Sequence, residues 1–235
     1  MRFRTSGGVS ACEVVIAVLR NDLVFTKRYF SWFSILFLYS VMCVCAWGQR
    51  SCKWPEATFL APGNAVFPGE VASGANPGML VGQPLTSTFS ITTSAGTTTG
   101  TIVSAVYIKG GTLDFYYQVS NDLSSALPLV AVEATSFTGF RTCVAFRADG
   151  SDLPGFQNGI NPPVTATSSN PPPAGGFEIG FQFYPPAAPP TEIAPGSTSL
   201  VLIISTNATH ANDKGAAIVL DQAAGANTSA YQPIL

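Results

Sequence analysis

Apolar and polar residues alternate with a period of two along most of this chain, not with the 3.6-residue period of an amphipathic helix. In Leu113–Val119, four apolar residues alternate with Asp114, Tyr116 and Gln118. Such alternation places one face of a strand in a core and the other face in water. The same pattern recurs in Phe177–Phe183. We therefore predict two half-buried strands at these positions.

A continuous aliphatic run, Leu200–Ile204, predicts a further strand that is covered on both faces. Weaker strand patterns occur in Ser87–Thr93, Thr98–Ile108, Leu127–Ala134, Gly139–Phe146 and Ala216–Leu220. Turn residues separate these runs, and two longer connections are expected, an exposed loop at Asn161–Gly176 and an extended segment at Tyr184–Pro195. About eight to ten strands with this spacing predict an all-β fold, a single antiparallel β-sandwich of the jelly-roll or immunoglobulin-like type.

An apolar leader is expected to precede this body. The basic pair Lys27 and Arg28 is followed by a mostly apolar run at 33–46 and then by small residues, which is the order found in a secretory signal peptide. The predicted division of the chain is an N-terminal extension at 1–26, a signal peptide or signal-anchor helix at 27–48, an extended segment at 49–85 and the β-sandwich at 86–235.

The leader leaves two alternatives open. Cleavage after Ala46 or Gly48 would release a secreted or cell-envelope protein. An uncleaved leader would anchor the protein in the membrane, because residues 29–47 would form about 28 Å of helix, enough to cross a bilayer core. Residues 1–26 would then be a cytoplasmic tail. Otherwise they are expected to be non-native or disordered, the result of a start site assigned too early.

Charge and composition beyond the leader restrict the class of partner. From Gln49 onward there are six basic and eleven acidic residues, a formal net charge of −5. Nucleic acid is not an expected partner, because no basic face is available to neutralise phosphates. All 18 prolines lie at or beyond Pro55, which fits short strands joined by turns and disfavours long helices.

Two of the five cysteines, Cys52 and Cys143, lie beyond the leader. In an exported protein such a pair suggests one disulfide bond. In the predicted strand, Cys143 shares a face with Arg141 and Arg147, where an N-terminal segment carrying Cys52 could cross the sheet. Two unpaired thiols and a lipid-attachment cysteine in the leader are the alternatives.

Catalytic motifs are missing from the sequence. His210, the single histidine, lies in the polar stretch Asn207–Asp213, which is predicted to be a turn, and no Gly-x-Ser-x-Gly motif accompanies it. Common metal and nucleotide motifs are also missing, so no cofactor is expected. A carboxylate pair for glycoside cleavage could be drawn from Asp114, Glu133 and Glu178, but nothing in the sequence pairs them. The protein is therefore not expected to be an enzyme.

Two weaker candidates for binding remain. Asp149, Asp152 and Asn158 lie near one another, with Asn161 close by, and oxygen-rich loops of this kind can hold calcium. Asp and Asn also favour ordinary solvated turns. Tyr116, on the face predicted to meet water, could contact a glycan or could simply cover the sheet.

Three strand-and-turn segments, Gly111–Asp122, Thr138–Gly150 and Ile193–Thr209, give residues 86–235 a resemblance to the body of bacterial PEP-CTERM proteins. These are exported surface proteins, often of exopolysaccharide-producing bacteria, whose C-terminal Pro-Glu-Pro motif, transmembrane helix and basic tail are processed by an exosortase. The resemblance implies export and a β-rich body, and it transfers no active-site residue. The sequence stops at Leu235 where that tail would begin, which implies release without sorting or a relative that has lost the tail.

Together these features predict an exported, non-catalytic extracellular or cell-envelope protein with a structural, adhesive or matrix-associated role. Its expected partners are extracellular polysaccharide or matrix, with membrane contact only through an uncleaved leader. A carbohydrate-binding module that uses Tyr116 is the first alternative, and a secreted hydrolase that uses His210 is the second.

Overall fold

The computed structural model describes residues 52–169, 179–184 and 192–235. The expected N-terminal extension and leader lie outside the described residues, as do Phe177, Glu178 and most of the predicted Tyr184–Pro195 segment. Residues Arg50–Leu235 form one compact unit. No helix in the described part of the chain is long and apolar enough to cross a membrane.

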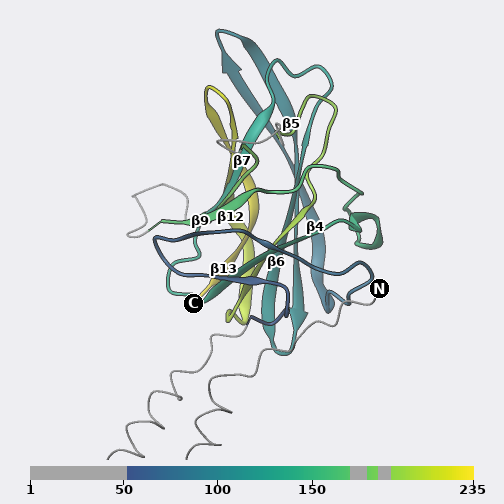
Figure 1. The fold of residues 1–235 in the computed structure, drawn as a ribbon, viewed down its shortest axis with the longest axis vertical. Coiled ribbons are helices and arrows are strands. Elements are labelled where there is room, and N and C mark those ends of the chain that lie inside the picture. Colours follow the sequence, from purple (N-terminus) through teal and green to yellow (C-terminus); the bar gives the residue numbers. More distant parts are fainter. Residues whose placement is uncertain (1–51, 170–178, 185–191) are drawn as a thin grey trace, which may run out of the picture. The chain divides into compact units, whose positions relative to one another are not determined.

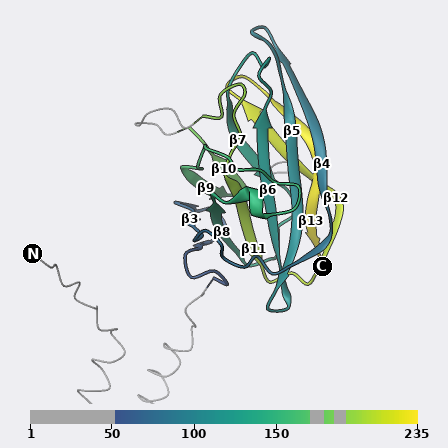
Figure 2. The ribbon, with the colours of Figure 1, turned by 90° about the vertical axis from the view of Figure 1, so that its right-hand side faces the viewer.

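Two sheets face each other in a β-sandwich (Figures 1 and 2). The first sheet has the order β1-β8-β11-β6-β5-β4, with β3 also paired to β8. The second has the order β13-β12-β7-β10-β9-β2. In the first sheet the strands are β1 (Thr58–Leu60), β3 (Gly69–Glu70), β4 (Met79–Thr93), β5 (Gly96–Lys109), β6 (Thr112–Asn121), β8 (Thr142–Arg147) and β11 (Val201–Thr206). In the second they are β2 (Ala65–Val66), β7 (Leu129–Ala134), β9 (Thr165–Ser168), β10 (Ile179–Gln182), β12 (His210–Asp221) and β13 (Gly225–Ile234).

The all-β sandwich predicted from the sequence is confirmed, and each of the eight predicted strand segments overlaps a strand. The described residues contain thirteen strands, more than expected. The predicted exposed loop at Asn161–Gly176 contains β9, and the predicted turn around His210 is wrong because β12 begins at that residue. Strands β1 to β3 lie within 49–85, the segment expected to precede the sandwich.

The main hydrophobic core lies between the two sheets. The first sheet contributes Phe115, Leu202 and Ile204, and the second contributes Phe181 and Val219, all of them buried. Burying side chains of this size contributes about 1.5–3 kcal/mol each. At one side the two sheets are also joined through β13, where the hydroxyl of Thr228 donates to the carbonyl of Thr88 in β4 at 3.0 Å.

A second hydrophobic cluster covers the outer face of the first sheet. The strap, which we define as residues 52–75, contributes Trp54 and Val71, and a loop at 149–160 contributes Phe156. These side chains pack against residues such as Tyr116 and Ile203 on the strands below. In Figure 1 the strap is the dark blue segment that runs across the strands.

This second cluster corrects one sequence expectation. Asp114, Tyr116 and Gln118 were predicted to face water, but they are 0%, 0% and 2% exposed. The alternation in Leu113–Val119 does separate two faces of β6, and the strap and the 149–160 loop bury the more polar one. By contrast, the prediction that Leu200–Ile204 is covered on both faces is confirmed, because its residues divide between the two clusters.

The strap is fastened to β8 by a covalent bond and by backbone pairing. Cys52 and Cys143 form the predicted disulfide bond. Strand β1 pairs with β8 antiparallel and β3 pairs with it in parallel, the one parallel pairing among the described strands. At Gly69 the strap passes so close to the Glu56 carbonyl that a Cβ atom would collide with it. Glycine is therefore required where the strap folds back on itself.

Removing the disulfide should destabilise the sandwich. We expect the double variant Cys52→Ala/Cys143→Ala to lose about 2–4 kcal/mol of unfolding free energy, since the bond closes a long loop. Urea unfolding at pH 7 measures this, and the wild-type protein in reductant is the matched control and should behave like the variant. Equal unfolding midpoints for the oxidised protein and the double variant would contradict the prediction.

Candidate binding site

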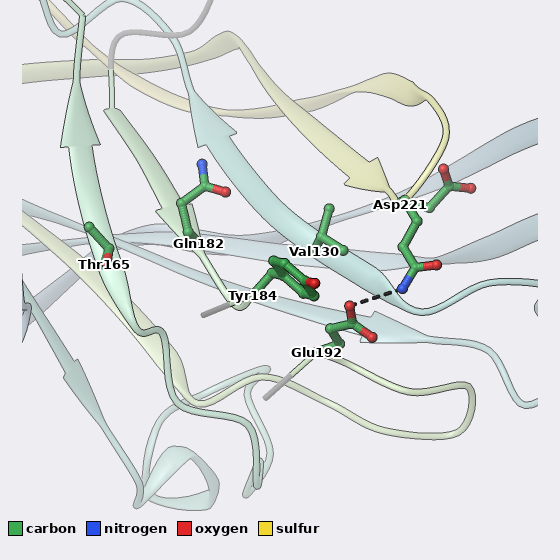
Figure 3. Close-up of a pocket in the computed structure, with 7 residues that line it drawn as sticks. Val130, Thr165, Gln182, Tyr184, Glu192 and Asp221 are labelled. Atoms are coloured by element: carbon green, nitrogen blue, oxygen red, sulfur yellow. Dashed lines mark hydrogen bonds between the residues drawn. The ribbon is translucent and has the colours of Figure 1, made fainter. Parts of the chain in front are cut away.

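An open hollow of about 620 Å³ lies at one end of the second sheet, where β10 and β12 end and β7 and β9 begin (Figure 3). Its size is within the range of small-ligand sites in proteins. The lining residues are Val130, Thr165, Gln182, Tyr184, Glu192, Asp221 and Gln222.

One wall of the hollow is formed by the end of the β9–β10 pair. Thr165 and Gln182 lie opposite each other in the strand register. The backbone amide of Val164 donates to the Gln182 carbonyl at 2.7 Å, which extends the pairing by one residue. The Thr165 hydroxyl and the Gln182 amide are thus carried on paired backbone and not on a free loop.

The opposite wall is held by hydrogen bonds around Glu192. The Gln222 side-chain amide donates to Oε1 of Glu192 at 2.9 Å, and the Asn161 side-chain amide donates to the Glu192 carbonyl at 3.0 Å. The next residue, Ile193, forms an isolated bridge with Leu129. Glu192 is therefore fixed through both its backbone and its side chain.

Asp221 supports this wall through the turn that precedes β13. It is only 4% exposed, and its Oδ1 accepts the backbone amides of Ala223 and Ala224, each at 2.8 Å. This is the Asx-turn arrangement that closes a tight connection, here between β12 and β13. Asp221 thereby sets the position of Gln222, which bonds to Glu192.

Tyr184 supplies the aromatic surface of the hollow and is 59% exposed. Its neighbour Phe183 is fully buried in the main core, and the Phe183 amide donates to the Val130 carbonyl at 2.8 Å. This anchor fixes the chain immediately before Tyr184. Figure 3 shows the Tyr184 ring between Gln182 and Glu192, beside Val130.

Tyr116, predicted as a glycan contact, is buried, so that prediction is wrong. Its ring centroid lies 4.6 Å from that of Tyr107 and 6.4 Å from that of Phe156, within the second cluster. Sequence reasoning missed Tyr184 because the predicted strand ends at Phe183, although its alternation, continued by one residue, places Tyr184 on the face opposite the buried Phe183.

The residues suggested for calcium are engaged in holding loops together. Both carboxylate oxygens of Asp149 accept from the buried Arg147 guanidinium at 2.6 Å, and one of them also accepts the Gly74 amide. The hydrogen bond from Arg147 lowers the pKa of Asp149. Asn158 accepts the Ser151 amide at 3.0 Å. Asp152 is exposed, and the described residues contain no group of three or more His, Cys, Asp or Glu that could hold a metal ion.

The carboxylates considered for glycoside cleavage are not brought together. Asp114 lies on the outer face of the first sheet, where it accepts from Lys53 Nζ at 2.9 Å and from the Trp54 indole at 3.2 Å. Glu133 lies on β7 of the second sheet, beside Gly180 and Ile218. Glu178 lies outside the described residues. His210 is exposed, and its Nδ1 lies 3.0 Å from the Thr209 hydroxyl.

In comparisons with protein-family models, curated protein sequences and solved structures, nothing matched this chain.

Asp114 should be required for docking of the strap. We expect Asp114→Ala to cost about 2–4 kcal/mol of unfolding free energy, because it leaves Lys53 and the Trp54 indole without their shared acceptor. Denaturant unfolding gives the energy, and limited proteolysis reports release of the strap. Asp213→Ala is the matched control. Its pair with Lys214 is exposed at the surface, so no measurable change is expected. Equal losses in both variants would contradict this role for Asp114.

Glu133 should make stability depend on pH. It is 8% exposed, and burial raises its pKa to about 7. The folded protein therefore favours the protonated acid. The resulting contribution to the free energy of unfolding is fully present below the unfolded-state pKa and is lost as the pH rises through about 7. We expect Glu133→Gln to be about 1–3 kcal/mol more stable than wild type at pH 8, with little difference at pH 4.

Urea unfolding at the two pH values tests this expectation. The exposed Glu70 provides the control, since Glu70→Gln should not change the pH dependence. If Glu133→Gln gains no more stability at pH 8 than at pH 4, the Glu133 carboxylate is not the source of the pH dependence.

Proposed function

We propose that the protein is exported and serves, without catalysis, as a structural, adhesive or matrix-associated component outside the cell or in its envelope. The observation that carries this proposal is the Cys52–Cys143 disulfide. Such bonds form and persist in oxidising compartments and are rare in the cytosol. The predicted leader at 27–48 and the resemblance to PEP-CTERM proteins support the same compartment.

The absence of catalysis is supported by how the reactive side chains are used. Asp114 is bound by two strap residues, and Asp149 is bound by Arg147 and by a strap amide. In these positions the carboxylates fasten the strap and are not directed at a substrate. His210 is the only histidine of the chain, and it bonds to its neighbour Thr209.

Two alternatives lose support. The carbohydrate-binding module built on Tyr116 no longer has its contact residue, because that ring is buried. The secreted hydrolase built on His210 has no nucleophile motif in the sequence to pair with it. The formal charge of −5 beyond the leader favours neutral partners over polyanions such as nucleic acid.

Export and oxidation can be tested together. The full gene is expressed in a bacterial host, cells and medium are fractionated, and the protein is digested without reduction for mass spectrometry. We expect a mature N-terminus at Trp47 or Gln49 and a linked peptide that joins Cys52 to Cys143, in the medium or the envelope fraction. Oxidation depends on export, because the cytoplasm keeps thiols reduced.

The other outcomes are distinct. An intact leader in the membrane fraction, with the disulfide formed, would favour the membrane-anchored alternative through residues 29–47. Protein that stays in the cytoplasm with two free thiols would contradict the proposal. The structural or matrix role is tested separately by glycan pull-down and self-assembly assays. It would be contradicted if neither assay detected an interaction.

A further inference from the structure

We propose that the hollow around Tyr184 binds a segment of a neutral polysaccharide, with the tyrosine ring stacked against one sugar and the amides and carboxylate around it bonded to sugar hydroxyls. This inference rests on the proposed non-catalytic, extracellular role, since it names the partner that such a protein would meet. It assigns the binding to a site different from the one the sequence suggested.

The Tyr184 ring is positioned to stack against a sugar. Tyr184 is largely exposed, and it lines the hollow together with residues of four strands. An exposed ring of this kind offers a flat apolar surface with a polar edge, which suits a pyranose ring with C–H groups on its face and hydroxyls at its rim. Because Phe183 anchors the adjacent backbone, little freedom of that backbone is lost when a ligand stacks on the ring.

The walls of the hollow carry groups that can bond to sugar hydroxyls. Two side-chain amides, Gln182 and Gln222, and the Thr165 hydroxyl can each donate and accept hydrogen bonds, as sugar hydroxyls also can. Glu192 adds a strong acceptor. The described lining residues include the carboxylates of Glu192 and Asp221 but no lysine, arginine or histidine. An anionic polysaccharide would meet like charge there, so the hollow selects against uronate chains.

Hydrogen bonds within the protein hold the wall of the hollow that carries Glu192. Glu192 is held by Gln222 and Asn161, and the Asp221 turn holds Gln222. A wall fixed in this way needs little ordering when a ligand binds, which favours affinity. Asp221 is thus a positioning residue, and Tyr184 and Gln182 are the contact residues. The described lining residues enclose an open hollow, which leaves room for a chain longer than one sugar.

The test uses the purified, oxidised protein. Affinity electrophoresis and titration calorimetry are run with three neutral polymers, hydroxyethylcellulose, laminarin and galactomannan, and with polygalacturonate as the anionic comparison. We expect saturable binding to at least one neutral polymer and weaker binding to polygalacturonate. Tyr184→Ala should weaken binding at least about tenfold, Gln182→Ala about threefold to tenfold, and Tyr184→Phe much less, because a phenyl ring still stacks.

A matched control separates stacking from general surface effects. Met79 is another exposed apolar residue, at 68%, and lies on β4 of the first sheet. Met79→Ala should bind as wild type does. Because Tyr184 is largely exposed, its variant is expected to fold normally, and urea unfolding checks this directly.

Three results would overturn the inference: no binding to any neutral polymer, binding to polygalacturonate as tight as to the neutral ones, or wild-type affinity in Tyr184→Ala. The proposed function fails on different evidence, namely the cell fractionation described above or the release of reducing sugar ends from a bound polymer. Such release would contradict the non-catalytic role and would leave the measured binding in place.

Discussion

The first sheet carries large apolar side chains on both of its faces, and the rest of the structure depends on covering the outer one. Strand β11 shows this most clearly, because Leu202 and Ile204 lie in the core between the sheets while Val201 and Ile203 lie in the cluster outside. An antiparallel sandwich commonly leaves the outer face of each sheet in water. Here, leaving that face in water would cost about 25 cal/mol for each Å² of exposed apolar area. The strap and the 149–160 loop are therefore needed as a third layer.

Buried charges determine where this third layer sits. Burial raises the pKa of Asp114 even though the hydrogen bond from Lys53 opposes the shift. The carboxylate is therefore held at some energetic cost, and pairs of this kind add little net stability. Arg147 is likewise buried, and it reaches both Asp149 and the Ala75 carbonyl of the strap. These groups find all their partners only when the strap lies in its observed position. We infer that they select that position, while the apolar contacts and the disulfide supply most of the stability.

The sequence could predict what depends on local pattern, and it could not predict what depends on how distant segments meet. Period-two alternation located the main strands, and a run of aliphatic residues located β11. Strands β1 to β3 are two or three residues long, too short to show any period. Strand β13 was missed because its inward residues, such as Ala226 and Ala230, are small and give little contrast with their polar neighbours. For Tyr116, alternation showed that two faces differ but not that the strap would cover one of them. The hollow combines residues from Val130 to Gln222, which only the folded sheets bring together.

The strap also links the disulfide to the hollow. After β1 pairs with the first sheet, the chain crosses to the second sheet, where β2 pairs with β9. Ser168 in β9 also exchanges backbone hydrogen bonds with the strap, accepting from Gly63 and donating to Asn64. The chain then returns to the first sheet as β3. Strand β9 carries Thr165, one of the residues that line the hollow. The covalent bond at Cys52 thus holds one end of the strap whose strand β2 pairs with a wall of the hollow. We infer that oxidation favours both the covered face of the first sheet and the shape of the hollow at the end of the second.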